Sequence, residues 1–241
     1  MVSSDDVTHS ENYVTELIEF YPDNLIISKS PAYEGLFSVI RDKNTQTPSF
    51  VHHADRLMRI LVEDALAALS SRPPAASVET PCGPTAQNFR RPVDPGIVTA
   101  VSIIRAGDSL LEVVRGILPG LASVGKILIQ RDENSSQKNA VVYYDKLPPT
   151  ISKNDVILCD PMLATGGSSL AALDILVKKG GVDPGRIVFC NVLTCPEGVH
   201  AVLKAYPAVT IVTAQIDPYL NEQKFIVPGL GDFGCRYFGT A

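Results

Sequence analysis

Short apolar runs rich in Val and Ile recur through the second half of this 241-residue chain. They lie at 97–104, 126–130, 155–159, 186–194 and 209–216. Stretches with helical spacing separate several of them, at about 108–118, 169–179 and 197–205. Strands that alternate with helices indicate βαβ units and a parallel sheet that is buried on both faces. The pattern therefore predicts an α/β fold.

Three further segments have weaker patterns. Apolar residues with the spacing of one helix face run over 55–69, and the two prolines at 73–74 prevent that helix from continuing. Residues 77–96 are rich in turn-forming residues and are predicted to form a hairpin or loop. The polar stretch that begins the segment 131–148 is too long for a tight turn, and this segment is predicted to form a protruding arm or lid.

The two ends of the chain complete this organisation. Residues 1–31 are mostly polar apart from one apolar stretch at 25–27, and they are predicted to be a partly ordered lead-in. Residues 217–241 contain four glycines and little helical periodicity, which predicts a shaped loop segment. No internal repeat is visible. We expect one domain with elaborations at both ends.

Composition excludes several classes of protein. The net charge is −5 without a Lys/Arg cluster, which argues against nucleic acid as the main partner. No apolar stretch approaches the roughly 20 residues that a membrane span needs. The N-terminus lacks the features of a secretion signal, and five cysteines without a CxxC pair favour a reduced, cytoplasmic protein. The four histidines lack metal-ligand spacing.

The most informative stretch is 155–169. Apolar residues lead into Asp160 at the predicted end of a strand, a loop ends in Ala164-Thr-Gly-Gly-Ser168, and a helix begins at Ser169. Adjacent glycines let several backbone N–H groups point at one spot, and a helix N-terminus adds unpaired donors and partial positive charge. By itself the loop could be an ordinary capped turn, with Asp160 a turn residue. The sequence of strand, acidic residue, glycine-rich loop and helix favours a phosphate site.

The phosphate motifs that the chain lacks, and the acidic residue before its loop, indicate which kind of phosphate compound would bind. The chain has neither the GxxxxGK[ST] pattern of a P-loop nor the GxGxxG pattern of dinucleotide sites. An acidic residue shortly before the loop suits the hydroxyl groups of a sugar whose phosphate the loop holds. This points to a ribose 5-phosphate.

At this point a family resemblance becomes visible. Residues 156–168 resemble the phosphoribosyl pyrophosphate (PRPP) motif of the type I phosphoribosyltransferases, and Asp160-Pro161 with the residues that follow is similar to the uracil phosphoribosyltransferase branch. The resemblance extends from about Phe50 to the C-terminus. It implies a Rossmann-like parallel sheet flanked by helices, with a C-terminal hood over the base site. The single domain 1–241 would then comprise an N-terminal extension (1–50), a PRPP-binding core (97–216) and a uracil-binding hood (217–241).

The resemblance also implies PRPP ligands. Residues 103–107 are similar to the family segment whose arginine and adjacent backbone contact the pyrophosphate, and Arg131 falls on the second PRPP-binding arginine. Each arginine follows a predicted strand, on the edge where the loop after Asp160 lies. A lone arginine there would usually be a surface charge. The implied PRPP ligands are Arg105, Ala106, Gly107, Arg131, Asp160, Pro161, Met162, Leu163, Ala164, Thr165, Gly166, Gly167, Ser168 and Asp232.

The C-terminal residues 216–240 resemble the uracil-binding segment of the family. The implied uracil ligands are Ile226, Gly231, Asp232 and Phe233. In isolation the segment would look like a glycine-rich tail capped by aromatic residues. The chain departs from the family at Phe225, where Tyr is frequent, and at Cys235, where a charged residue is commoner. We expect the first departure to weaken base binding modestly and the second to lie outside the contact shell.

The implied reaction converts uracil and PRPP to UMP and pyrophosphate. Its catalytic residues would be Asp160, Arg131 and Asp232, with Asp232 the candidate for an acid–base or metal-water role. Mg²⁺ would reach the site bound to PRPP rather than in a metal site of the protein. The resemblance further implies a homodimer or homotetramer, and some relatives are activated by GTP.

Three other hypotheses are compatible with the same residues. The chain could be a pyrimidine regulator that binds RNA with the same fold, although its acidic charge and its base-pocket segment argue against this. It could transfer to another nucleobase, such as a purine or orotate. It could also be a non-catalytic relative, which would be expected to have lost an arginine or the phosphate loop.

Overall fold

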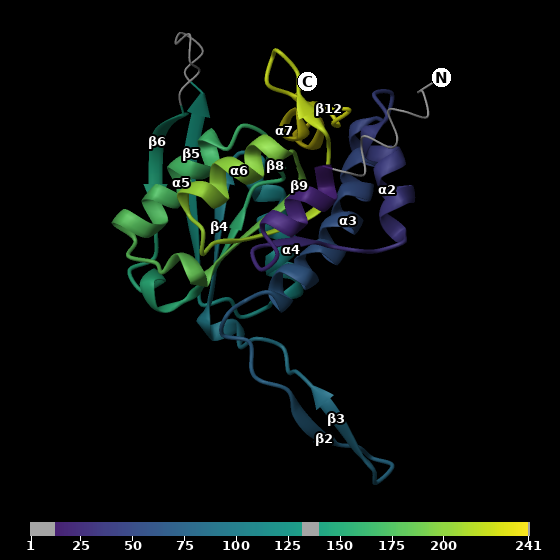
Figure 1. Cartoon of the computed structure of the whole chain (residues 1–241), viewed down its shortest axis with the longest axis vertical. Coiled ribbons are helices and arrows are strands. Elements are labelled where there is room, and N and C mark those ends of the chain that lie inside the picture. The colour runs from purple at the N-terminus through teal and green to yellow at the C-terminus, as the bar shows by residue number, and fades with distance from the viewer. Residues whose placement is uncertain (1–12, 132–139, 241) are drawn as a thin grey trace.

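The computed structural model describes residues 13–131 and 140–240, and it places a single large sheet at the centre of the molecule (Figure 1). The strands lie in the order β1-β10-β9-β7-β4-β5-β6, and β8 pairs with β9 beyond the end of β7. All pairings are parallel except that of β6 with β5. The strands are β1 (Leu25–Ile27), β4 (Val98–Ile104), β5 (Ser123–Arg131), β6 (Ala140–Lys146), β7 (Asp155–Cys159), β8 (Met162–Leu163), β9 (Ile187–Thr194) and β10 (Thr210–Ile216). The predicted α/β class is confirmed.

Helices cover both faces of this sheet, and each face has its own apolar core. Alternate residues of β7 divide between them: Ile157 and Cys159 belong to the core under α2, α3 and α4, while Val156 and Leu158 belong to the core under α5 and α6. Burial on both faces explains why these strands are continuous apolar runs. The helices are α2 (Ala32–Arg41), α3 (Thr47–Ala67), α4 (Gly107–Ile117), α5 (Gly167–Asp174) and α6 (Pro196–Ala205), with a π-helical turn η3 at Ile175–Lys179 and short 3₁₀ turns η1 (Pro95–Ile97), η2 (Ile151–Lys153) and η4 (Pro184–Arg186).

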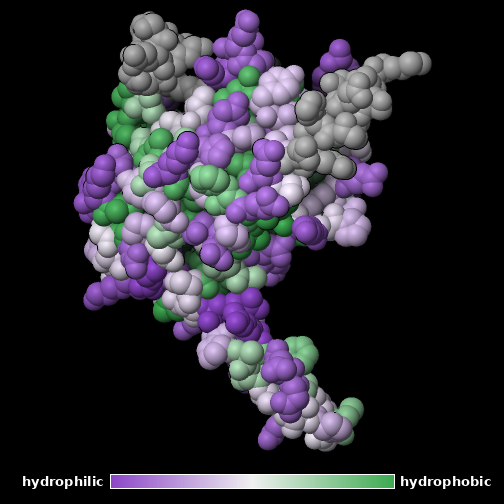
Figure 2. Space-filling model, viewed as in Figure 1, coloured by the Kyte–Doolittle hydropathy of each residue, from purple (hydrophilic) through white to green (hydrophobic). Residues whose placement is uncertain are grey.

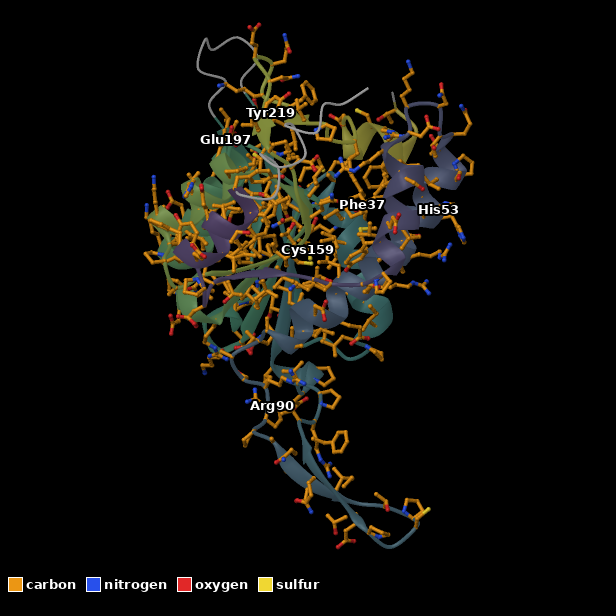
Figure 3. All side chains as sticks on the ribbon, turned by 45° about the vertical axis from the view of Figure 1, so that its right-hand side comes forward. Phe37, His53, Arg90, Cys159, Glu197 and Tyr219 are labelled. Atoms are coloured by element: carbon orange, nitrogen blue, oxygen red, sulfur yellow. The ribbon has the colours of Figure 1, made fainter. Side chains whose placement is uncertain are left out.

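Two further segments have different positions: one projects from the body of the molecule, and the other joins the edge of the central sheet. The region predicted as a hairpin or loop contains the hairpin β2 (Ala76–Glu79) and β3 (Thr85–Phe89), which stands clear of the rest of the chain in Figures 1 and 2. Arg90 lies where this hairpin joins the body (Figure 3). The segment predicted as an arm or lid instead contributes β6, because its residues 140–146 pair antiparallel with β5 and extend the sheet. That interpretation was wrong for 140–146, and residues 132–139 lie outside the described part of the chain.

The N-terminal segment is more integrated than a lead-in. Residues 13–20 are helical, and β1 pairs in parallel with β10 at one edge of the sheet. The hydroxyl of Tyr13 donates a hydrogen bond to the carbonyl oxygen of Ile216 at 3.0 Å. From residue 13 onward the predicted lead-in is therefore part of the domain.

The C-terminal segment also has more regular structure than a loop. It forms the two-stranded ribbon β11 (Tyr219–Leu220) and β12 (Ile226–Val227), followed by the short helix α7 (Phe233–Phe238). The helix begins because the Asp232 carboxylate accepts a hydrogen bond from the N–H of Cys235 at 2.7 Å. Among the helices of the described residues, none is long and apolar enough to cross a membrane.

Candidate active site

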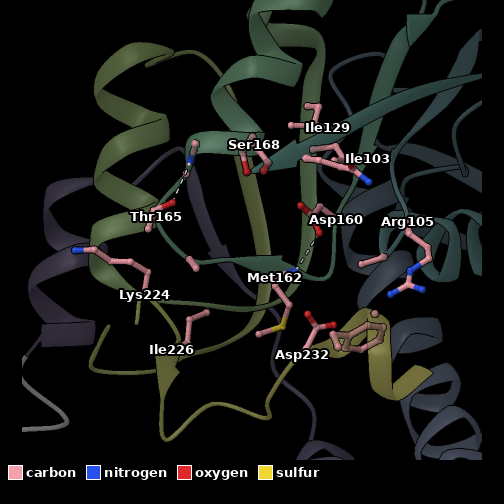
Figure 4. Close-up of a pocket in the computed structure, with 18 of the residues that line it drawn as sticks. Ile103, Arg105, Ile129, Asp160, Met162, Thr165, Ser168, Lys224, Ile226 and Asp232 are labelled. Carbon is pink, nitrogen blue, oxygen red and sulfur yellow. Dashed lines mark hydrogen bonds between the residues drawn. The ribbon is translucent and has the colours of Figure 1, made fainter. Parts of the chain in front are cut away.

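A cavity of about 930 Å³ opens at the carboxyl ends of the central parallel strands (Figure 4). Its walls come from the ends of β4 and β5, the segment after β7, the first turn of α5 and the C-terminal segment around β12 and α7. In open α/β sheets, ligands bind at this edge because the connections diverge there. The cavity therefore lies where the sequence places its phosphate motif.

The cradle, which we define as residues 160–168, is fixed to the strand beside it. The N–H of Asp160 donates to the carbonyl of Cys190 at 3.3 Å, and the carbonyl of Pro161 accepts from the N–H groups of Val192 and Leu193 at 2.9 and 3.0 Å. The Asp160 carboxylate accepts from the N–H of Met162 at 3.4 Å. These bonds hold the carboxylate of Asp160 at the cavity wall.

The two glycines of the cradle have different environments. Gly166 has a left-handed φ of 82°, and a Cβ on it would lie 2.8 Å from the Cβ of Ala201. A Cβ on Gly167 would meet only the Thr165 hydroxyl, at 3.7 Å. Gly166 thus makes the turn, and Gly167 leaves space at the start of α5, where backbone N–H groups have no partner within the helix.

Thirteen of the predicted ligands line this one cavity although they come from four separate segments. They are Arg105, Ala106, Asp160, Met162, Ala164, Thr165, Gly166, Gly167, Ser168, Ile226, Gly231, Asp232 and Phe233. The structure thus brings together residues from the turn after β4, the cradle and the C-terminal segment. Figure 4 shows Asp160 and Asp232 on opposite sides of the same space.

Three predicted ligands do not line the cavity, and a fourth lies outside the described side chains. Gly107 is a packing position, because a Cβ there would lie 2.1 Å from the carbonyl oxygen of Cys159. Pro161 and Leu163 are buried, with their backbone bonded to neighbouring elements. The backbone of Arg131 ends β5 on the same sheet edge, but its side chain is not among those described.

Nine further residues line the cavity. Most of them stand next to a predicted ligand in the sequence, so the position of that ligand could have indicated that they also line the cavity. Lys224 lies within the segment 216–240 that resembles the uracil-binding segment, but it was not singled out there; it has a left-handed φ of 68° in the turn between β11 and β12. The nine are Ile103, Ile104, Leu128, Ile129, Gln130, Ser169, Lys224, Phe225 and Gly234.

Arg105 follows β4 and reaches the C-terminal segment. Its Nη1 donates to the hydroxyl of Thr240 at 3.0 Å, its Nη2 donates to the sulfur of Cys235 at 3.4 Å, and its Cζ lies 5.7 Å from the ring centroid of Phe238. Cys235 itself is not among the residues that line the cavity. Its sulfur touches a predicted PRPP ligand.

Phe233 shows how the base side of the cavity is supported. Its side chain is 1% exposed, stacks on Tyr237 at 5.6 Å and meets Phe50 of α3 edge-on at 5.3 Å. Its ring is therefore part of the core, and only a few of its atoms can face a bound molecule. Together with the capping bond of Asp232, this packing shapes the wall of the cavity.

Comparison with known proteins assigns the family. The profile of the uracil phosphoribosyltransferase family matches residues 27–240. The chain belongs to this family. It is 40% identical to the uracil phosphoribosyltransferase of Dictyostelium discoideum over 91% of this chain and 98% of that protein. It is 43% identical to the uracil phosphoribosyltransferase of Saccharomyces cerevisiae, over 85% and 90% of the two chains.

The fold agrees with a solved relative. A protein from Aquifex aeolicus superposes with a TM-score of 0.74 at 27% identity, covering 90% of this chain and 99% of that one. The predicted family and the type I phosphoribosyltransferase fold are thus confirmed. Neither the RNA-binding regulator nor a different nucleobase specificity is favoured by these relatives.

Proposed function

We propose that this chain transfers ribose 5-phosphate from PRPP to N1 of uracil, giving UMP and pyrophosphate. The observation that carries the proposal is that one cavity joins the cradle to the C-terminal wall of Ile226 and residues 231–233 in a member of this family. A phosphate held at the start of α5 and a base held by the C-terminal segment would then share one space. The transferred ribose would lie between them.

Each wall of the cavity binds a different part of PRPP in this proposal. The N–H groups at the start of α5, with the hydroxyls of Thr165 and Ser168, bind the 5-phosphate. Asp160 binds the ribose hydroxyls. Arg105 and Arg131, at the ends of neighbouring strands, bind the pyrophosphate. Proximity contributes to the rate, because both reactants are held in one orientation.

The chemistry requires charge stabilisation more than proton transfer. Breaking the bond at the anomeric carbon builds positive charge on the ribose and negative charge on the departing pyrophosphate. The two guanidinium groups stabilise the negative charge where it develops. Mg²⁺ carried in on PRPP would supply further neutralisation of the phosphates when bound.

The carboxylates in the cavity fit such a carried cation. Within residues 13–131 and 140–240, no group of three or more His, Cys, Asp or Glu side chains could hold a metal ion. Asp160 and Asp232 each line the cavity, so a cation that arrives with phosphate oxygens could gain carboxylate oxygens from them. Asp232 is also the proposed acid–base or metal-water residue.

Uracil would be recognised mainly by backbone N–H and carbonyl groups. Gly231 has a φ of 81°, and together with Gly234 it brings backbone atoms to the cavity wall without large side chains. Uracil presents two carbonyl oxygens around an N–H, which backbone donors and acceptors can match. Buried polar pairing discriminates strongly against bases that leave these groups unmatched.

The proposal also covers the location of the enzyme, its oligomeric state and its partners. We place it in the cytoplasm as a homodimer or homotetramer without a nucleic acid partner, and we count GTP as a candidate activator. The cysteines without a CxxC pair support the cytoplasmic location, and the acidic net charge of −5 supports the absence of a nucleic acid partner.

Pyrophosphate release and UMP formation from PRPP test the proposal. Uracil, cytosine, orotate, hypoxanthine and no base are compared in Mg²⁺ buffer. We expect UMP and pyrophosphate in equal amounts with uracil only. Preference for hypoxanthine or orotate would overturn the base assignment, and absence of PRPP binding would overturn the whole site.

A further inference from the structure

The side chain of Arg105 is held by the C-terminal residues rather than by its own strand. Figure 4 shows its guanidinium directed toward α7. The Thr240 hydroxyl and the Cys235 sulfur each accept one of its N–H groups, at 3.0 and 3.4 Å, and the ring of Phe238 lies 5.7 Å from its Cζ. Arg105 and Thr240 are 135 positions apart in the sequence.

All three of these contacts are electrically neutral. A hydroxyl, a thiol and an aromatic ring orient a guanidinium without cancelling its charge. Within the described ranges, Arg105 forms no ion pair with a carboxylate. A guanidinium has five N–H donors, so those that Thr240 and Cys235 do not use can meet phosphate oxygens.

The acceptors themselves are fixed in place. The N–H of Cys235 donates to Asp232 at 2.7 Å, and the hydroxyl of Tyr237 donates to Asp55 of α3 at 2.6 Å. A Cβ on Gly234 would lie 3.6 Å from the Cβ of Ala106, so the first turn of α7 packs against the residue that follows Arg105. The C-terminal segment is thus a rigid support for the arginine as well as a wall for the base.

We propose that Thr240 and Cys235 are positioning residues that orient Arg105 toward the pyrophosphate of PRPP, so that the base-binding segment and a pyrophosphate ligand form one unit. The inference rests on the proposed function of the site. It gives the C-terminal residues a role on the PRPP side of the reaction, in addition to the base side. It also gives Cys235 a role that a carboxylate could not fill without pairing with Arg105.

Variants at Thr240 test the orienting bond. Thr240→Val keeps the size of the side chain but removes the acceptor, and we expect KM for PRPP to rise about tenfold, the scale of a hydrogen bond to a charged group. Thr240→Ser keeps the hydroxyl and should restore most of the loss. KM for uracil should change less than KM for PRPP.

Variants at Cys235 test whether the group that accepts from Arg105 must be uncharged. Cys235→Ser retains a neutral acceptor and should have near-normal kinetics. Cys235→Asp would place a carboxylate beside the guanidinium, where it competes with pyrophosphate for the same charge. We expect KM for PRPP to rise at least as much as in Thr240→Val, with unchanged thermal stability.

A double-mutant cycle separates positioning from general damage. In the Arg105→Ala background, Thr240→Val should have no further effect on PRPP affinity in calorimetric titration. Tyr237→Phe is the matched control, because it removes a contact of the same helix that does not involve Arg105. Its effect should be the same in both backgrounds.

The outcomes distinguish this inference from the proposed function. If wild-type protein does not bind PRPP, the proposed site itself fails. If it binds PRPP and Arg105→Ala weakens binding, while Thr240→Val and Cys235→Asp leave binding unchanged, the site stands and the positioning role is overturned. Equal losses from Thr240→Val with and without Arg105 would also overturn it.

Discussion

At residue scale, the cradle depends on two adjacent glycines that the sequence could not tell apart. Both were predicted to lie at the phosphate. Only the structure shows that Gly166 is needed for its left-handed φ and its contact with Ala201, whereas Gly167 has open space at its missing Cβ. The difference decides which of them can be changed without disturbing the fold.

Gly167→Val should leave the protein folded and abolish PRPP binding. Its Cβ would meet no atom closer than 3.7 Å, but the branched side chain would displace phosphate from the N–H groups at the start of α5. We expect PRPP affinity to fall by more than about 100-fold, or about 2.7 kcal/mol, in calorimetric titration. Gly35→Val is the control, since Gly35 lies on the exposed face of α2 with no atom within 4 Å of a Cβ. Wild-type affinity in Gly167→Val would refute the cradle.

Arg131→Ala should impair the chemical step rather than the fold. The residue ends β5, next to β4, on the edge where the cavity opens. Loss of one charge that stabilises the leaving pyrophosphate should lower kcat/KM by about two to three orders of magnitude. Thermal unfolding should barely change. A destabilised variant with intact kcat/KM would show that Arg131 is structural.

Lys224 has a backbone conformation that suits glycine better. Its φ is 68°, and the left-handed region costs about 1–2 kcal/mol for a residue with a Cβ. Part of the gain from Lys224→Gly is offset by the entropy of glycine in the unfolded chain, about 0.5–1 kcal/mol. We expect Tm to rise by about 1–3 °C. Asn88→Gly, at a φ of 61° on the distant hairpin, should gain less because Asn tolerates this region. A lower Tm for Lys224→Gly alone would mean that the lysine side chain itself stabilises the turn.

At the scale of elements, the central strands could be predicted and the edges could not. β4, β7 and β9 are mostly apolar because both of their faces are buried. β6 contains exposed Val and Tyr side chains, which favour a strand, but no local pattern reveals that this strand pairs with β5 at the edge of the sheet. α3 begins eight residues before the predicted helix, since its first turns contain Pro, Ser and two histidines that obscure the apolar period.

One buried carboxylate joins several elements at the end of the sheet opposite the cavity. Asp155, the first residue of β7, is fully buried and accepts from the hydroxyl of Ser70 at 3.1 Å, the N–H of Ser71 at 2.9 Å and Nε of Arg186 at 3.0 Å. It thereby connects the end of α3 to η4. No pattern in the sequence distinguishes Asp155 from the other acidic residues.

Asp155→Ala should therefore reduce stability without affecting catalysis. It leaves a guanidinium and an N–H group without their acceptor, and we expect a loss of about 2–4 kcal/mol in denaturant unfolding. Asp183→Ala is the control at the same end of the sheet, because Asp183 is exposed and only caps η4, which is worth about 1 kcal/mol. Both folded variants should keep the wild-type KM values. A change in KM for either substrate in Asp155→Ala would contradict the separation of the two ends.

At the scale of the whole molecule, the N-terminal helices support the C-terminal wall of the active site. Arg236 donates to the carbonyl oxygens of Ile40 and Asp42, and the hydroxyl of Tyr237 donates to Asp55. In Figure 1, α7 lies beside the ends of α2 and α3. Sequence patterns predicted the two ends separately. They could not predict that the two ends contact each other, because the bonds of Arg236 join its side chain to backbone oxygens almost 200 positions away.

A network of hydrogen bonds ties α2 to the start of the C-terminal segment. Arg41 donates to both carboxylate oxygens of Asp217, at 2.8 and 2.7 Å, and to the carbonyl of Gly229 at 2.7 Å. Asp217 is 3% exposed and also accepts from the N–H of Gly229 at 2.8 Å. Arg41 thus holds both ends of the ribbon that carries Ile226, although it lies outside the cavity itself.

Arg41→Met should weaken uracil binding from a distance. It leaves the carboxylate of Asp217 buried without its cation, so we expect a loss of about 3 kcal/mol in unfolding free energy. Because displacement of positioning groups is costly, KM for uracil should rise about tenfold while KM for PRPP changes less. Arg115→Met is the control: its exposed pair with Glu112 should contribute less than about 0.5 kcal/mol. In the double variant Arg41→Met/Asp217→Asn, part of the lost stability should return because no buried charge remains. If KM for uracil stays at the wild-type value in a destabilised Arg41→Met protein, the ribbon is positioned by other contacts, and the N-terminal helices serve the fold alone.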